Sequence, residues 1–378
     1  MRSEATWVFT DCVGHNFGGL AGLGRSITIY PMKKNNLLKW GLVSRFILCL
    51  SLWASTQSSQ AHSKNLFFEM CMKPPSQADQ STIEIMNWRA GLDMKTKDER
   101  ICSQAADQLK SLVHLRLDRT PFDPWWELSS LNPIATQPQL LSLSGSHNHF
   151  SDLAPLKGLS QLQTLIFWDN EIENLEPISS LKNLSHLILT KNQITSIHPL
   201  SQLHPLMELA LGENLIETLE PLTHLLHLES LSFEKNKIHS LDPLEKLEKL
   251  KYLTGNFNYI SDLNPIRNLR KLKFLSLSYN QIPNLDGLQE LTELDALDLR
   301  DNQIKDLSAL SHLSQLRWLD IRENQISDFS PLAVLQDLEY LYLEGNKTSS
   351  LSPELLQLTE EHLNSKGKWI RLEVDIKR

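Results

Sequence analysis

Hydrophobic residues recur along most of the chain in one fixed pattern, L-x-x-L-x-L-x-x-N, as in Leu184, Leu187, Leu189 and Asn192. Leucines that alternate at the fourth and sixth positions predict a short strand with one buried face. The asparagine returns every 22 residues without a slip. Its ten positions are Asn148, Asn170, Asn192, Asn214, Asn236, Asn258, Asn280, Asn302, Asn324 and Asn346. A period that never changes predicts one unit that is copied and stacked into a solenoid.

The second half of each unit predicts a short return segment. An isoleucine stands two residues after the asparagine in most copies, and Phe150 takes its place in the first. Prolines then recur at Pro155, Pro177, Pro199, Pro221, Pro243, Pro265 and Pro331. Proline fixes φ and disfavours a long helix. About a dozen residues remain for the return, which favours a short 3₁₀ or extended turn on the side opposite the strands.

The repeated asparagine predicts a structural ladder. It ends each strand, where the chain turns inward and leaves its strand partners. A buried asparagine amide offers two donors and an acceptor to turn backbone that would otherwise lack hydrogen bonds. Stacked copies therefore place one asparagine above the next beside a parallel sheet, and these residues are predicted to support the fold and not to bind a ligand.

The repeat resembles the 22-residue class of leucine-rich repeats found in bacterial internalins and in phosphatase-regulatory subunits. Asn258-Tyr-Ile-Ser-Asp-Leu-Asn-Pro-Ile and Asn324-Gln-Ile-Ser-Asp-Phe-Ser-Pro-Leu resemble internalins most. The resemblance covers residues 140–351 and implies an α/β, right-handed horseshoe with parallel strands on the concave face. It implies a binding scaffold and no particular chemistry. The sequence departs from the pattern where Gly145 and Gly255 replace the sixth apolar residue, and where Gly287 and Ala309 replace proline.

The N-terminal region has the parts of a secretory signal peptide. From Met32, a basic start precedes an apolar stretch and a small polar run that ends at Ala61, which is the order found in such peptides. We therefore expect translation to start at Met32, residues 1–31 to be a non-native or disordered extension, and cleavage to follow Ala61. A membrane anchor is the alternative, but the apolar run is short and contains Arg45.

Cysteine usage agrees with export. The expected cleavage leaves Cys71 and Cys102, and two cysteines in a chain bound for an oxidising compartment predict one disulfide. Two buried free thiols are the alternative. Residues 62–111 contain apolar positions that favour a small helical cap, which a solenoid needs because its end otherwise exposes core leucines. Repeats follow over 112–351, namely one divergent copy and the ten regular ones.

The divergent copy and the C-terminus complete the array. Thr120 takes the asparagine position in the first copy, and an extra segment with Trp125 and Trp126 predicts an ordered loop. The two tryptophans are expected to cover the cap, and a role in ligand binding is the alternative. After Asn346 the pattern decays. Residues 352–378 are expected to form a C-terminal cap, with a helix over 354–364 that begins after Pro353 and a final strand over 369–376.

Strand positions three, five and seven are free of the leucine core, so their identities carry the functional information. Late copies place aromatic side chains beside Asp and Arg, the types that dominate binding hot spots. The predicted partner-binding residues are Tyr252, Phe274, Asp298, Arg300, Trp318, Asp320, Arg322, Tyr340 and Tyr342, with Trp168 in a smaller early patch. The alternative is that these rings only stack between neighbouring strands and stabilise the sheet.

The net charge and the sequence motifs limit the classes of function and partner that the chain can have. The formal net charge is −8, and removal of residues 1–61 makes it more negative, which argues against nucleic acid as a partner. His147 with His149, and His224 with His227, lack the Cys or carboxylate cluster that a zinc site needs. No hydrolase, metalloprotease or nucleotide-binding motif is present. We expect no cofactor and no enzyme activity.

The sequence therefore predicts an exported (secreted, periplasmic or cell-surface) monomeric scaffold that binds a protein on its concave face, in adhesion or host contact. Two alternatives remain open. One is an intracellular enzyme-regulatory subunit, which requires an uncleaved or untranslated apolar segment and reduced cysteines. The other is a glycan-binding module that uses the exposed aromatic rings.

Overall fold

The computed structural model describes residues 60–89, 91–92, 98–119, 127–347 and 371–373. The chain divides into two compact units, Met1–Ser58 and Ser59–Arg378, and all described residues lie in the second. Several predictions fall outside this part of the chain: the extension, nearly all of the signal peptide, the loop with Trp125 and Trp126, and the helix over 354–364. Within the described residues, no helix combines the length and apolar character needed to cross a bilayer.

In the described part of the chain, the first strand is preceded by the helices α2 (Gln60–Met72), α3 (Gln77–Arg89) and α4 (Glu99–Leu109). A disulfide joins Cys71 of α2 to Cys102 of α4, and both cysteines are buried. The predicted helical cap and disulfide are therefore confirmed. The cap is bonded to the repeats through α3, because the Thr82 hydroxyl donates to the Ser130 carbonyl at 2.7 Å.

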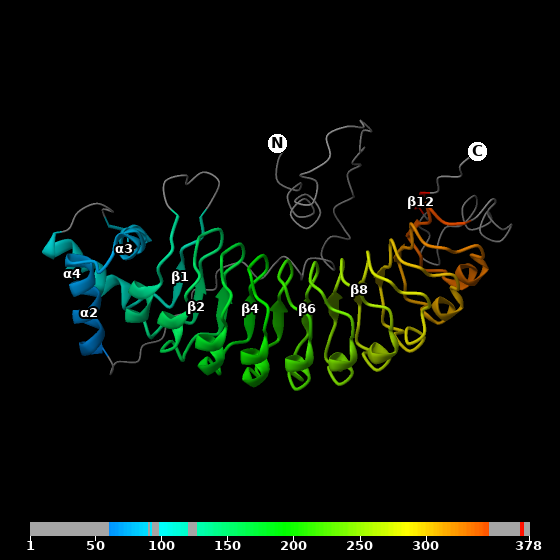
Figure 1. Ribbon diagram of the computed structural model, residues 1–378, viewed down its shortest axis with the longest axis horizontal. Helices are drawn as coiled ribbons and strands as arrows, with labels where there is room; N and C mark the ends of the chain where they lie inside the picture. The colour runs from blue at the N-terminus through cyan, green and yellow to red at the C-terminus, as the bar shows by residue number, and fades with distance from the viewer. Residues whose placement is uncertain (1–59, 90, 93–97, 120–126, 348–370, 374–378) are drawn as a thin grey trace, which may run out of the picture. The chain divides into compact units, whose positions relative to one another are not determined.

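The repeats form one parallel sheet in which each strand pairs with the next along the chain, as predicted (Figure 1). Register advances by one repeat per strand, so Leu187 lies beside Leu209. The strands are β1 (His114–Arg116), β2 (Ser142–Ser144), β3 (Thr164–Ile166), β4 (His186–Ile188), β5 (Glu208–Ala210), β6 (Ser230–Ser232), β7 (Tyr252–Thr254), β8 (Phe274–Ser276), β9 (Ala296–Asp298), β10 (Trp318–Asp320), β11 (Tyr340–Tyr342) and β12 (Arg371–Glu373). β12 lies within the predicted final strand and pairs with β11.

Short 3₁₀ helices form the return side, again as predicted. They are η2 (Asn132–Thr136), η3 (Ala154–Leu156), η4 (Glu176–Ser180), η5 (His198–Gln202), η6 (Glu220–Leu222), η7 (Asp242–Leu244), η8 (Asn264–Ile266), η9 (Ser308–His312) and η10 (Ser330–Val334). Proline occupies the first helical turn of each except η9, where its fixed φ suits the helix start. The copy with Gly287 makes a turn instead. There φ is +99°, and an added Cβ would lie 2.5 Å from the Leu263 carbonyl oxygen, so only glycine fits.

The asparagines bond the turn at the end of each strand. The Asn214 amide donates to the carbonyls of Leu189, Leu211 and Gly212, each at 3.0 Å. Its side-chain oxygen accepts the Ile194 amide of the preceding copy at 3.0 Å. Each regular asparagine makes the same kind of bonds and thereby links adjacent repeats. The ladder satisfies backbone groups that the strand-to-turn transition leaves without partners.

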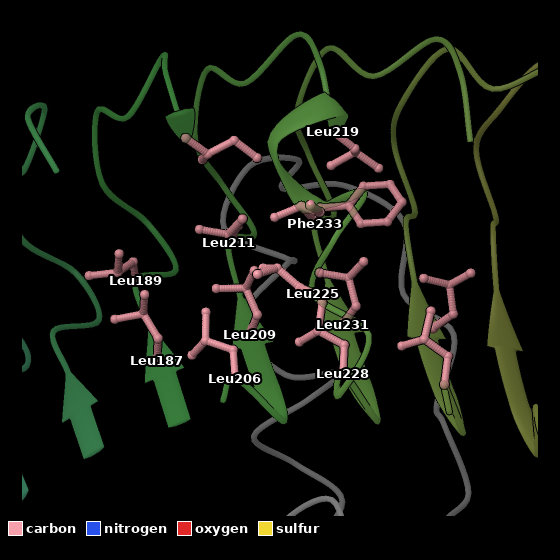
Figure 2. Close-up of a cluster of buried hydrophobic side chains, with 14 of the residues drawn as sticks. Leu187, Leu189, Leu206, Leu209, Leu211, Leu219, Leu225, Leu228, Leu231 and Phe233 are labelled. Carbon is pink, nitrogen blue, oxygen red and sulfur yellow. The ribbon is translucent and has the colours of Figure 1, made fainter. Parts of the chain in front are cut away.

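The core lies between the strands and the return segments. Leu206, Leu209 and Leu211 extend from one repeat into the interior. Beside them lie Leu228 and Leu231 of the next repeat and Leu225 from the return segment that joins the two (Figure 2). These leucines have essentially no exposed surface. Burying a leucine contributes roughly 1.5–3 kcal/mol, so a continuous row of such residues is the main force that holds consecutive repeats together.

Candidate functional site

We call the outward side chains of β1–β11, together with the seventh residue of each repeat, the strand face. Because the strands are in register, residues at one position of successive repeats form columns across this face. The predicted binding residues lie in these columns. The late ones, which we call the late patch, are brought together on β7–β11 and their C-terminal ends.

The aromatic residues of the late patch are half-buried and lie next to one another across the strands. Tyr252 lies beside Phe274, and Trp318 lies beside Tyr340, in strand register. The Trp318 ring is 5.7 Å from the Tyr342 ring at a tilt of 52°. Ring contact between neighbouring strands, as in the alternative interpretation, therefore occurs for this pair, in a tilted and not a stacked arrangement. Part of each ring remains accessible, so the same residues also offer contact area to a partner.

An ion pair anchors the C-terminal part of the late patch. The Arg322 Nε donates to both Asp320 carboxylate oxygens, at 2.9 and 3.0 Å. The Arg322 guanidinium also lies 5.0 Å from the Tyr342 ring centroid and 3.7 Å from Glu344. Burial alone would lower the pKa of Arg322, but Asp320 and Glu344 raise it. Asp320 is only 2% exposed, so it orients Arg322 and offers little surface of its own.

The neighbouring pair, Asp298 and Arg300, is arranged differently. Asp298 accepts the Ser276 hydroxyl at 2.9 Å and the Arg300 amide at 3.2 Å. Burial raises the pKa of Asp298, and the charge of Asp320 adds to the shift despite these hydrogen bonds. The Arg300 guanidinium lies over the Tyr279 ring, 5.5 Å from its centroid.

Trp168 lies apart from the late patch, since it follows β3 and β4–β6 intervene. Its ring contacts His147 at a centroid distance of 4.5 Å. The intervening strand face is built from small residues such as Ala210, Gly212 and Ser232. Burial raises the pKa of the carboxyl groups there, Glu208 and Glu234. The structure therefore supports two separate surfaces and not one continuous aromatic face.

A second group of rings lies at the C-terminal edge of the strands. The Phe257 and Tyr279 rings are stacked at 4.1 Å, and Tyr259 stacks on His239 at 4.9 Å. Phe257 is 40% exposed and Tyr259 is 45% exposed. We call Phe257, Tyr259 and Tyr279 the rim cluster. Sequence reasoning missed Tyr259 because it searched the strand positions, whereas Tyr259 follows the asparagine in a column that is mostly polar.

Charged and histidine side chains form small networks at the early end of the array. His149 is 2.5 Å from Glu171 and 3.2 Å from Glu127. His147 and Lys191 both contact the Asp169 carboxylate, at 2.9 and 2.8 Å. Across the described ranges, no group of three or more His, Cys, Asp or Glu side chains has the arrangement of a metal site.

Comparison with known proteins agrees with the fold. Residues 270–312 and 314–356 match the family described as Leucine Rich repeats (2 copies). No curated protein matches the sequence. An internalin from Listeria monocytogenes is similar in structure, with 25% sequence identity, a TM-score of 0.63, and coverage of 83% of this chain and 93% of the internalin. A leucine-rich-repeat protein from Leptospira interrogans is 26% identical, with a TM-score of 0.60 and coverage of 72% and 74%.

The internalin and Leptospira matches span the same kind of strand-and-turn stack that the 22-residue period builds here. The family match falls on copies that contain β8–β11 and therefore most of the late patch. The repeat, the fold and these comparisons together identify the chain as a leucine-rich-repeat protein.

Proposed function

We propose that the chain is an exported, non-enzymatic scaffold that binds a protein partner on its strand face, with the late patch as the main contact. The observation that carries this proposal is the grouping of half-buried Trp318, Tyr340 and Tyr342 around the Arg322–Asp320 ion pair. Rings held by neighbours lose little conformational freedom on binding, and Tyr, Trp and Arg dominate hot spots for this reason.

Export is supported by two observations. The Cys71–Cys102 disulfide is a bond that persists in oxidising compartments. The segment from Met32 to Ala61 has the composition of a signal peptide. The internalin likeness at 25% identity also favours a surface or secreted binding protein. Sequencing the N-terminus of the mature protein tests this step. We expect it to begin after Ala61, and a chain that retains residues 32–61 would contradict it.

The binding test compares three forms of the full chain in affinity capture from native lysate and culture medium. The first is wild type, and the second carries Trp318→Glu and Tyr340→Glu. The third is a matched control with Leu226→Glu and Val334→Glu, two residues exposed by 46% and 55% on the return side. Circular dichroism checks that all three fold alike.

We expect one protein to be retained by wild type and by the return-side control, and to be lost from the strand-face variant. Two truncated anchors at about 2 kcal/mol each would weaken binding by roughly a thousandfold if their effects add. Equal capture by all three forms would contradict the late patch as the site. Capture that depends on glycan and not on protein would favour the glycan-binding alternative.

A further inference from the structure

Two adjacent repeats carry the same Asp-x-Arg sequence, with aspartate at the fifth position and arginine at the seventh. Asp298 and Asp320 lie beside each other in strand register. The same residues at the same positions of one repeat would be expected to make the same contacts. The structure instead shows two different arrangements, and the difference identifies one arginine as available to a ligand.

The guanidinium of Arg322 is paired with carboxylates of the chain itself. Its Nε donates to both carboxylate oxygens of Asp320, and Glu344 lies 3.7 Å from its Nη1. Two carboxylates therefore compensate this guanidinium. A ligand carboxylate that approached Arg322 would have to compete with Asp320, which is buried and already placed for a two-point contact.

Arg300 has no such partner. Within the described part of the chain, no carboxylate pairs with its guanidinium, and its Nε is buried without a hydrogen-bond acceptor. Its contact is with the face of the Tyr279 ring. An unsatisfied buried donor is unfavourable, and a cation–π contact is weaker than a two-point hydrogen-bonded pair with a carboxylate. The side chain is therefore held loosely in its present position.

One difference between the two pairs lies one repeat earlier. Asp298 has Ser276 at the fifth position of the preceding repeat, and that hydroxyl donates to its carboxylate at 2.9 Å. Asp320 has Asp298 at the same place, which supplies no hydroxyl and repels it. Asp320 consequently needs Arg322 as a partner, whereas Asp298 does not need Arg300. Because Ser276 bonds Asp298, the guanidinium of Arg300 can bind an anion from outside the chain.

The surroundings of Arg300 select the kind of anion. Asp298, Asp320 and Glu344 make the late patch unfavourable for a polyanion such as nucleic acid, and the whole chain carries a net charge of −8. A single carboxylate matches the planar guanidinium and adds only one negative charge. The rim cluster adjoins the site through Tyr279, so an apolar surface with exposed Phe257 lies next to the cation.

We propose that Arg300 receives the carboxylate of an Asp or Glu side chain on the protein partner, and that the rim cluster contacts an apolar residue beside that acid. This inference rests on the proposed function, since it names the chemistry that the strand face recognises. On binding, the guanidinium turns from the Tyr279 face toward the incoming carboxylate and satisfies its Nε.

The test uses a displayed library of random peptides selected on the full wild-type chain. One selected peptide and its analogue, in which the acid is replaced by the matching amide, are then measured by fluorescence anisotropy. The proteins are wild type, Arg300→Gln, Trp318→Glu with Tyr340→Glu, and the control Arg267→Gln. Arg267 is an exposed arginine on the return side, with 57% of its side chain accessible.

We expect the selected peptides to share an Asp or Glu at one position. Replacing it by the amide should weaken binding about tenfold on wild type and on Arg267→Gln, but less than about twofold on Arg300→Gln. Selected peptides without a shared acid, no binding peptide, or an equal loss on Arg300→Gln and wild type would overturn the inference. Unchanged binding to the Trp318→Glu, Tyr340→Glu variant would instead count against the proposed function.

Discussion

At the scale of single residues, the turn after each strand depends on the residue just before the asparagine. This residue has a positive φ in nine copies although none of the nine is glycine, with values between 51° and 59°. The residues are His147, Asp169, Lys191, Glu213, Lys235, Phe257, Tyr279, Asp301 and Glu323. The left-handed conformation costs an L-residue roughly 1–2 kcal/mol. The asparagine bonds hold the backbone there, so each repeat contains a small, repeated strain.

Glu323 offers a direct test of that strain, because the next copy already has Gly345 at the same place, with φ +74°. We expect Glu323→Gly to be more stable than Glu323→Ala by about 1 kcal/mol in urea unfolding. Both variants remove the same side chain, so the comparison isolates the backbone. In an ordinary strand the order is reversed, and an alanine variant as stable as the glycine variant would contradict the strain.

Protonation of His149 is expected to make the free energy of unfolding depend on pH. The hydrogen bond to Glu171 raises the pKa of His149, burial opposes the shift, and the charges of Glu171 and Glu127 add to it. A raised pKa in the folded state means that the protonated imidazole stabilises the fold. This contribution is fully present below the unfolded pKa of about 6.5 and is lost as the pH rises through the higher folded pKa.

We therefore expect wild type to be more stable than His149→Gln at pH 5.5, by less than about 1 kcal/mol because the groups are half-exposed. The difference should shrink as the pH rises above 6.5. Urea unfolding across this range measures it, and Glu171→Gln is the matched control, since it should lose much of the same pH-dependent part. Unfolding free energies that stay parallel for wild type and His149→Gln would rule out the linkage.

At the scale of elements, two departures from the repeat are explained by their neighbours. An added Cβ at Gly255 would lie 2.6 Å from the Phe233 ring of the preceding repeat. One at Gly145 would lie 2.8 Å from Phe167 of the next. A large ring at the sixth position of one repeat thus fills the space that glycine leaves in its neighbour. Gly255 does not have a positive φ, so packing and not backbone conformation requires it.

This pairing predicts strong coupling between two substitutions. Gly255→Leu alone should cost about 1–3 kcal/mol by overpacking, and Phe233→Leu alone about 1–2 kcal/mol by leaving a cavity. The double variant restores leucine at both sixth positions, as in Leu189 and Leu211, and should recover more than about 1 kcal/mol of the summed loss. Urea unfolding of the four proteins measures the coupling. Additive losses would mean that the two side chains do not share one space.

The strands and return turns were predictable, because the buried leucines and the asparagine recur every 22 residues, which is also the length of one structural repeat. The side-chain partners were not. Arg300 and Arg322 stand in the same local sequence, but the residue 22 positions before each aspartate differs: Ser276 donates to Asp298, whereas Asp298 itself lies beside Asp320. Likewise Asp320 was expected at the binding surface but is buried beneath its arginine. Such choices depend on contacts between repeats, which a repeat pattern does not specify.

At the scale of the whole array, each repeat packs only on its neighbours, and the end repeats need covers. The N-terminal cover is the helical cap. Its α2 and α4 are joined by the Cys71–Cys102 disulfide, and it is bonded to the first repeats through Thr82 and Ser130. Closing a loop of this kind stabilises by roughly 2–4 kcal/mol. Loss of the disulfide should therefore destabilise the cap and the first strands most, and the destabilisation should decrease along the sheet.

Hydrogen exchange with mass spectrometry tests this in the Cys71→Ser, Cys102→Ser variant. We expect protection to fall more than tenfold in α2, α4 and β1, and to stay close to wild type in β8–β10. Each repeat contacts only its neighbours, so a loss of about 2–4 kcal/mol at one end is transmitted only weakly across the many interfaces between the cap and these strands. The distant strands serve as the internal control. An equal fall in β8–β10 would mean that the array opens as one unit. The disulfide in the cap would then stabilise the late patch as well as the end that the cap covers.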